Sequence, residues 1–213
     1  MSQKVFRICL FSMSAIIIGY CIYILRDIYA KQSPYQEVAL PFYGPKGDSS
    51  GKYHVPDFAF VNQDSQTITL RDLKGKVWVT DFFFTTCEGI CPIMKKNLKS
   101  VLDSFANEPD VMFLSHTVQP EYDSVKVLKA FSAQYGNIQH RWHFVTGDKL
   151  ELYNQARNAY FIAEPTDANI KEDFVHSQLL AIIDRSGRIR GYYDGTSEED
   201  KNKLVSDIRL LLK

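Results

Sequence analysis

Residues 77–92, VWVTDFFFTTCEGICP, decide the fold. The first part, Val77–Thr85, is a run of β-branched and aromatic residues, which indicates a buried strand. Cys87 and Cys91 follow it. Pro92 suits the first turn of a helix, where its missing N–H needs no partner. The stretch therefore predicts a buried strand that leads through a cysteine loop into a helix.

Strand and helix patterns alternate on both sides of this stretch. The expected elements are a hairpin (58–62, 67–70), a helix (92–105), a strand (111–117), a helix (124–135), a strand (142–145), a helix (149–160), two strands (177–183, 188–193) and a last helix (198–212). This order predicts an α/β protein with a mixed sheet flanked by helices. A cysteine pair at the junction of a central strand and its helix is typical of the thioredoxin-like fold.

The composition is that of a globular protein. Of 213 residues, 45% are apolar and 23% are charged. Lys plus Arg and Asp plus Glu each number 25, so the formal net charge is zero. Because nucleic-acid binders usually carry a basic excess, we expect no nucleic-acid partner.

An apolar segment precedes the folded body. Residues 8–25, ICLFSMSAIIIGYCIYIL, contain no charged residue, and as a helix they would span about 27 Å. Lys4 and Arg7 lie before this segment, so the positive-inside rule places the N-terminus in the cytoplasm and the body outside. We therefore predict an N-terminal transmembrane helix within a membrane anchor at residues 1–30. Cleavage as a signal peptide is the alternative, although Ile28-Tyr29-Ala30 matches a cleavage site poorly.

The next residues differ in character from both the anchor and the body. Residues 31–52 are rich in proline, glycine and serine, which predicts a linker. Residues 53–213 then form one domain, whose length is sufficient for a sizeable core.

The cysteine pair indicates redox chemistry or metal binding. Cys87 and Cys91 are the only cysteines of the body, because Cys9 and Cys21 lie in the apolar segment. The helix start favours a thiolate, whereas the Glu88 carboxylate opposes it, and the sequence leaves the balance open. Dithiol oxidoreductases usually have two residues between their cysteines, and here there are three. Such a loop can close a disulfide, or hold a soft cation with room for a third ligand.

Five histidines are candidates for that third ligand. In a thioredoxin-like arrangement the loop before the hairpin strand lies beside the cysteine loop, which favours His176. His116 stays open as an alternative, because its strand is expected to end on the same side. His54, His140 and His143 carry little information about a site when they have no partners.

Four features together resemble the Sco (SenC) family of copper proteins over about residues 53–213. They are a strand running into T-x-C-x-x-x-C-P (Phe83–Pro92), an F-x-S-x-T-V-x-P-like segment (Phe113–Pro120), W-x-F-x-T-G (Trp142–Gly147), and V-H-S followed by an apolar strand and D-x-x-G (Val175–Gly187). Their shared order and spacing are specific, whereas C-x-x-x-C alone would be weak. The chain departs from the family pattern at Glu88, where many members carry a neutral residue. It departs again at Gln119–Asp123, which replaces Asp-Pro-x-Arg-Asp and lacks its first Asp and its Arg.

The resemblance implies a single-span inner-membrane protein whose domain lies on the periplasmic side, or in the intermembrane space of a mitochondrion. It implies that Cys87, Cys91 and His176 bind one copper ion, as Cu(I) or Cu(II). The family helps to assemble the dinuclear copper centre of cytochrome c oxidase subunit II, so this chain is expected to be a metallochaperone rather than an enzyme. Copper delivery and reduction of the partner's cysteines both remain open.

Three other functions are alternatives for the cysteine pair. A thiol–disulfide oxidoreductase would use Cys87 and Cys91 as its redox pair and would not need His176. A thiol peroxidase would need a P-x-x-x-T-x-x-C pattern, and the upstream proline is missing here. A structural disulfide is disfavoured at a loop that leads into a helix.

Overall fold

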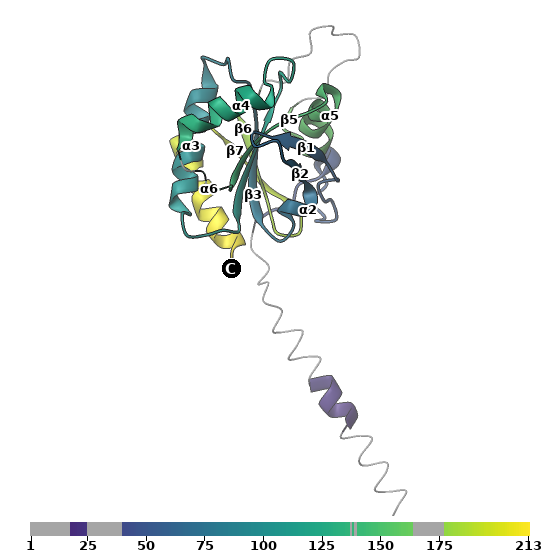
Figure 1. Ribbon diagram of the computed structural model, residues 1–213. Helices are drawn as coiled ribbons and strands as arrows, with labels where there is room; N and C mark the ends of the chain where they lie inside the picture. Colours follow the sequence, from purple (N-terminus) through teal and green to yellow (C-terminus); the bar gives the residue numbers. More distant parts are fainter. Residues whose placement is uncertain (1–17, 25–39, 137, 139, 164–176) are drawn as a thin grey trace, which may run out of the picture. The chain divides into compact units, whose positions relative to one another are not determined.

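The computed structural model describes residues 18–24, 40–136, 138, 140–163 and 177–213. It has two compact units, Met1–Val38 with Lys213, and Ala39–Leu212. In the first unit residues 18–24 are helical (purple in Figure 1). Across the described residues, no helix combines the length and apolar character needed to cross a membrane. Most of the span predicted at residues 8–25 lies outside the described residues.

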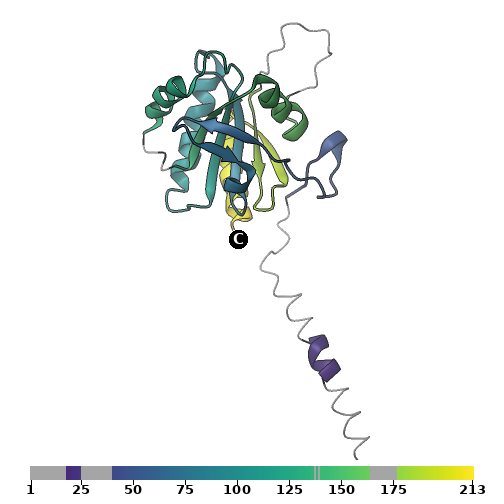
Figure 2. The same ribbon diagram turned by 45° about the vertical axis from the view of Figure 1, so that its right-hand side comes forward.

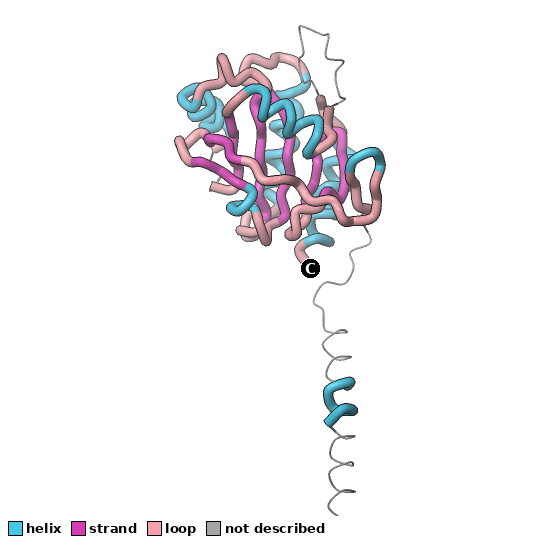
Figure 3. Tube along the Cα trace, turned by 90° about the vertical axis from the view of Figure 1, so that its right-hand side faces the viewer, coloured by secondary structure: helices cyan, strands magenta, loops and turns pink. Residues whose placement is uncertain are grey.

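The larger unit is built on a seven-stranded sheet with the order β2-β1-β5-β4-β3-β6-β7. Figure 3 shows its strands in magenta. Its strands are β1 (Ala59–Asn62), β2 (Thr67–Thr69), β3 (Val77–Phe83), β4 (Val111–Thr117), β5 (Trp142–Thr146), β6 (Leu179–Ile183) and β7 (Ile189–Asp194). β3, β4 and β5 are parallel, whereas β1 and β6 run antiparallel to the strands beside them. The mixed sheet confirms the predicted α/β class.

Helices cover both faces of this sheet (Figures 1 and 2). They are α2 (Leu70–Leu73), α3 (Ile90–Ser104), α4 (Val125–Ser132), α5 (Lys149–Asn154) and α6 (Glu198–Leu211), with short 3₁₀ turns at Pro45–Gly47 and Ala133–Tyr135 and a π-helical turn at Gln155–Ala159. α3 and α6 pack together on one face. α5 and the turn after it cover the other face.

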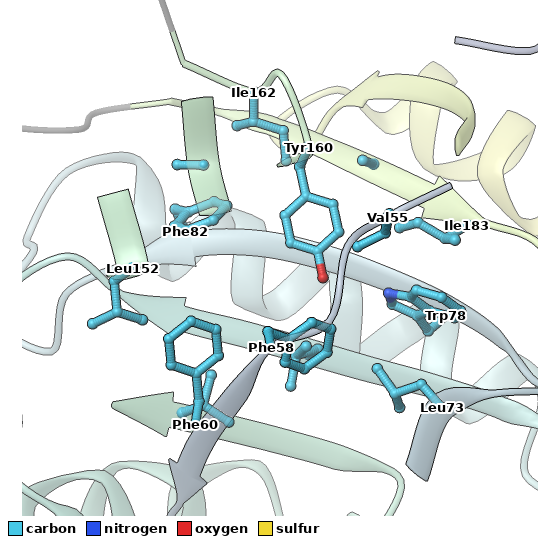
Figure 4. Close-up of a cluster of buried hydrophobic side chains, with 14 of the residues drawn as sticks. Val55, Phe58, Phe60, Leu73, Trp78, Phe82, Leu152, Tyr160, Ile162 and Ile183 are labelled. Atoms are coloured by element: carbon cyan, nitrogen blue, oxygen red, sulfur yellow. The ribbon is translucent and has the colours of Figure 1, made fainter. Parts of the chain in front are cut away.

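The face beneath α5 carries a large aromatic and aliphatic cluster (Figure 4). Trp78 and Phe82 of β3 lie in it together with Phe58, Leu152 and Tyr160, and all five are buried. Successive side chains of a strand point to opposite faces. Asp81 therefore points to the face covered by α3, which is also the face that receives the cysteine pair.

Three local features differ from the expected elements. β2 ends at Thr69 because a capping box starts α2, in which Thr69 N donates to Asp72 Oδ2 at 2.8 Å. The predicted helix at 149–160 changes to π-helical geometry at Gln155. Part of the expected linker contacts β7: the Arg190 guanidinium donates to the carbonyl oxygens of Leu40 (2.7 Å) and Pro41 (3.1 Å).

Candidate functional site

The cysteine loop joins β3 to α3 at the carboxyl end of the parallel strands. Gly89 is the N-cap of α3 and has φ −92° and ψ −108°. Cys87 lies in the loop and is half-buried, whereas Cys91 is the second residue of the helix and is buried. Both are free thiols. The expected positions of the two cysteines and of Pro92 are thus confirmed.

The start of α3 acts on the Cys87 sulfur. Burial alone would raise the pKa of the Cys87 thiol, but hydrogen bonds outweigh this effect and lower its pKa. The donors are the Cys91 thiol and the backbone N–H groups of Cys91, Gly89 and Ile90. The balance that the sequence left open is therefore set by the Cys91 thiol together with the first N–H groups of the helix. The Cys87 thiol therefore loses its proton more readily than an ordinary cysteine thiol.

Cys91 has the opposite character. Burial, donation of its thiol hydrogen to Cys87, and the nearby Cys87 charge raise the pKa of Cys91 to about 12. The Phe84 backbone N–H and the Lys95 ammonium act in the other direction, with smaller effect. The pair thus combines a half-buried thiol of lowered pKa with a buried thiol of raised pKa, and their sulfurs lie within hydrogen-bonding reach of each other.

Asp123 fixes the segment that precedes Cys87. Its buried carboxylate accepts hydrogen bonds from the Thr85 backbone N–H (3.2 Å), from Thr85 Oγ1 and from Thr117 Oγ1. Thr117 ends β4, and Thr85 lies two residues before Cys87. One side chain therefore ties the cysteine loop to the neighbouring strand. Sequence reasoning quoted Asp123 in a family motif but gave it no role.

A buried charge pair lies beneath α3, one helical turn beyond Cys91. Lys95 Nζ lies 2.5 Å from Asp81 Oδ2 and donates to Ser115 Oγ at 2.7 Å. Ser115 Oγ donates in turn to Asp81 Oδ1 at 2.5 Å and accepts from Trp142 Nε1 at 2.9 Å. Lys95 is fully buried. The sequence analysis missed this network. The signal was present, because Asp81 interrupts an apolar strand and Lys95 falls on the buried stripe of its helix.

His116 does not reach the cysteine pair. It is opposite Phe82 in the β3–β4 register, on the sheet face that carries the aromatic cluster, and its ring stacks on Phe82 at 4.7 Å. Its Nδ1 lies 3.2 Å from Thr80 Oγ1. Complete burial lowers the pKa of His116 to about 3. The alternative of His116 as third ligand was therefore wrong, because its side chain points away from α3.

The other described histidines do not complete a metal site either. His54 is exposed, and His143 is buried with its Nδ1 accepting from Asn62 Nδ2 at 3.1 Å. Among the residues that the structure describes, no three His, Cys, Asp or Glu side chains are grouped to hold a metal ion. His176 lies outside the described residues.

The chain after His176 returns beside the first turn of α3. Gly195 N donates to the Gln178 carbonyl oxygen at 2.8 Å. A Cβ added at Gly195 would lie 3.1 Å from that oxygen and 3.1 Å from Met94 Cγ. The Gln178 carbonyl oxygen and the Met94 side chain therefore both lie beside Gly195. Met94 is three residues after Cys91, and Gln178 is two residues after His176.

A sequence model of the SCO1/SenC family matches residues 46–213. The chain belongs to the SCO1/SenC family. This assignment agrees with the resemblance seen in the four sequence features, and the matched region contains both body cysteines and His176.

Solved Sco structures share the fold. A SCO1/SenC family lipoprotein from Bacillus anthracis is 29% identical, with a TM-score of 0.67 over 76% of this chain and 96% of that protein. BsSco, a member of the Sco family of cytochrome c oxidase assembly proteins in which a disulfide switch was identified, is 33% identical, with a TM-score of 0.63 over 75% and 93%. ScoI of Bradyrhizobium japonicum with copper bound is 19% identical, with a TM-score of 0.57 over 75% and 99%, which shows the fold alone.

Proposed function

We propose that this Sco protein binds one copper ion through Cys87, Cys91 and His176 and hands it to the dinuclear copper site of cytochrome c oxidase subunit II. Copper is the cargo of this reaction. The observation that carries the proposal is the adjacent pair of free thiols at the start of α3. Thiolate and imidazole are donors that suit copper, and two sulfurs with one nitrogen suit Cu(I) in particular.

The position of Gln178 supports His176 as the third ligand. Two residues of chain reach at most about 7 Å. Gln178 and Met94 both lie against Gly195, so a residue two positions before Gln178 is within reach of the helix turn that carries Cys91. A site with three ligands on a loop leaves room for a ligand of the partner to approach the copper, as hand-over requires.

A copper titration tests the ligand set. The reduced full-length protein receives Cu(I) under anaerobic conditions in competition with a chelator. We expect one tightly bound copper per chain. Affinity should fall in Cys87→Ser, Cys91→Ser and His176→Ala by more than the roughly 10–100-fold typical of changes in outer-shell partners. His54→Ala is the control, because His54 is exposed and, within the described part of the chain, its ring forms a hydrogen bond with the Lys52 carbonyl oxygen alone. If His176→Ala behaves like His54→Ala, His176 is not a ligand.

Thiol–disulfide exchange is the second candidate function, and the asymmetry of the pair favours it. The Cys87 thiolate would attack a disulfide of the partner and release one partner thiolate. Cys91 would then lose its proton and attack the Cys87 sulfur, which releases the second partner thiolate and leaves a Cys87–Cys91 disulfide. The partner gains two electrons and the pair loses two. His176→Ala separates the functions, because it should abolish tight copper binding and leave the reduction of an oxidised subunit II fragment intact.

We further propose that residues 8–25 anchor the protein in the membrane with the domain on its outer side. The support is the uncharged stretch and the flanking Lys4 and Arg7. The full chain should stay in the membrane pellet after an alkaline carbonate wash, whereas a variant that lacks residues 1–25 should not. Mass spectrometry of the purified protein decides between an intact anchor and a cleaved signal peptide. Recovery of the full chain in the wash would contradict the anchor.

A further inference from the structure

A pocket at the start of β3 is lined by three basic side chains. Arg71 and Lys74 come from α2 and the residue after it, and Arg185 comes from the turn between β6 and β7. The pocket has a volume of about 260 Å³. Among the described residues, Asp57 is the one acidic side chain on its lining. The size is that of a site for one small group rather than for an extended peptide.

These basic groups are poorly neutralised by the domain itself. Arg71 and Lys74 are exposed, and neither forms a salt bridge with a described residue. Arg185 Nη2 lies 3.8 Å from the Asp110 carboxylate and donates to the Leu212 carbonyl oxygen at 3.3 Å. The Nε of Arg185 is buried without a hydrogen-bond partner in the described part of the chain. Buried donors are normally paired, so this donor and the two free charges indicate an anionic ligand.

The pocket lies far from the cysteine loop. β3 separates Trp78, which lines the pocket, from Phe83, which precedes the loop, and its seven residues span roughly 20 Å. α2 lies at the end of the domain opposite α4 (Figure 1). An anion bound in this pocket would therefore not contact the candidate copper ligands.

The chain enters the domain at this same end. Arg190 donates to the Leu40 carbonyl oxygen, and its Nη1 also donates to Asp184 Oδ2 at 3.0 Å. Asp184 directly precedes Arg185. Leu40, at the start of the described domain, thus lies at the same end of the domain as the pocket.

We propose that this pocket binds the phosphate group of an anionic phospholipid and holds this end of the domain against the membrane surface. The inference rests on the proposed membrane attachment and extends it. Arginine presents a planar fork of donors that matches phosphate, and lysine adds a point charge. Basic residues close to an anionic membrane surface are attracted to it. Docking at this end leaves the cysteine loop facing away from the bilayer, where a partner can reach it.

Hydrogen exchange in lipid nanodiscs tests the docking. The full-length protein is placed in nanodiscs of phosphatidylcholine alone or with 30 mol% phosphatidylglycerol, at low salt. We expect amides of residues 70–75 and 184–188 to exchange several-fold more slowly in the anionic discs. Arg71→Gln/Lys74→Gln should abolish this protection. The matched control is Lys96→Gln/Lys126→Gln, which removes the same charge from exposed positions on α3 and α4 and should retain it.

Three results would overturn the proposal. The first is equal exchange in the two kinds of disc, and the second is equal loss of protection in the two double variants. The third is equal protection by 10 mM inorganic phosphate in the neutral discs, which would make the pocket a free-phosphate site. Copper titration of Arg71→Gln/Lys74→Gln distinguishes a failure of the docking proposal from a failure of the copper-binding proposal. That variant should bind copper normally whether or not it docks, because the pocket and the cysteine loop lie at opposite ends of β3.

Discussion

Lys95 is the one buried cation beneath the cysteine loop among the residues that the structure describes. Removing its charge should lower the unfolding free energy of the domain strongly. Lys95→Met leaves the Asp81 carboxylate buried without its counter-charge. Breaking a buried pair on one side typically costs about 3–5 kcal/mol of unfolding free energy. Urea denaturation of the copper-free protein measures this loss.

The same helix supplies a control for this prediction. Lys99 pairs with Asp103 at 2.6 Å in an exposed i,i+4 pair. Lys99→Met should therefore cost less than about 1 kcal/mol. Replacing both partners, as Lys95→Met/Asp81→Leu, should recover much of the loss, because no charge is left buried. Equal losses of unfolding free energy in Lys95→Met and Lys99→Met would show that the buried Lys95–Asp81 pair stabilises the domain no more than the exposed pair does.

Replacing tyrosine by phenylalanine should change the unfolding free energy differently at two buried positions, Tyr160 and Tyr193. The Tyr160 hydroxyl points toward the Trp78 indole nitrogen in Figure 4, but among the described residues neither atom has a partner that meets full hydrogen-bond geometry, so the contacts of Tyr160 with Trp78, Gln155 and Thr80 are weak. The Tyr193 hydroxyl donates to Asp207 Oδ2 at 2.6 Å. Tyr160→Phe should leave the unfolding free energy unchanged or raise it. Tyr193→Phe should lower it by about 1–3 kcal/mol, because it leaves a buried carboxylate without its donor. Thermal and urea unfolding rank the two variants, and a larger loss for Tyr160→Phe would contradict this assignment.

At the scale of elements, the loop between β3 and α3 should depend on its tie to β4. Thr85→Val removes the hydroxyl that donates to Asp123 and keeps the side-chain shape. One lost hydrogen bond is worth about 1–1.5 kcal/mol, so amides of residues 85–89 should exchange roughly 10-fold faster. Thr86→Val is the control, because Thr86 is exposed and makes no hydrogen bond to a described residue. Similar exchange in both variants would mean that Asp123 does not hold the loop.

Helices and strands were predicted well from the sequence where the spacing of hydrophobic residues determined them. β4 matches its predicted range, and α3 starts two residues earlier than expected because Gly89 serves as its N-cap. α2 was missed because four residues are too few for a period, and its start depends on the side chain of Asp72. The contact of Leu40 with Arg190 was missed because proline and glycine content does not reveal what a segment packs against.

The candidate site was predictable in part for similar reasons. Local spacing placed Cys87 and Cys91 correctly, since both belong to one loop and helix start. The face on which His116 lies depends on strand register, which a single sequence does not fix, and a shift of one residue reverses the face. The hydrogen bond between Thr85 and Asp123 joins residues 38 apart in sequence, and no local sequence pattern predicts it. His176 remains a prediction.

At the scale of the whole molecule, two buried histidines should make stability depend on mildly acidic pH. Burial lowers the pKa of His116 to about 3 and that of His143 to about 4. In the unfolded chain both should titrate near 6.5. A histidine whose folded pKa is depressed stabilises the fold fully above the unfolded value, and this contribution is lost as the pH falls toward the folded pKa. Each should therefore remove about 2 kcal/mol of unfolding free energy between pH 7 and pH 5, because the unfolded state takes up the proton and the folded state does not.

Urea unfolding of the copper-free protein at pH 7 and pH 5 measures this difference. His116→Leu fills the same site between Phe82 and Tyr160 with an apolar side chain, and it should halve the pH dependence whatever it does to stability at pH 7. His54→Leu, at an exposed position, should leave the pH dependence unchanged. The range from pH 7 to pH 5 also separates the histidines from the carboxylates. Burial would raise the pKa of Asp184, but Ser186 and its arginine partners lower it overall, so the contribution of Asp184 to stability is lost only at lower pH. A wild-type protein equally stable at pH 5 and pH 7 would mean that these two histidines are accessible to protons in the folded state.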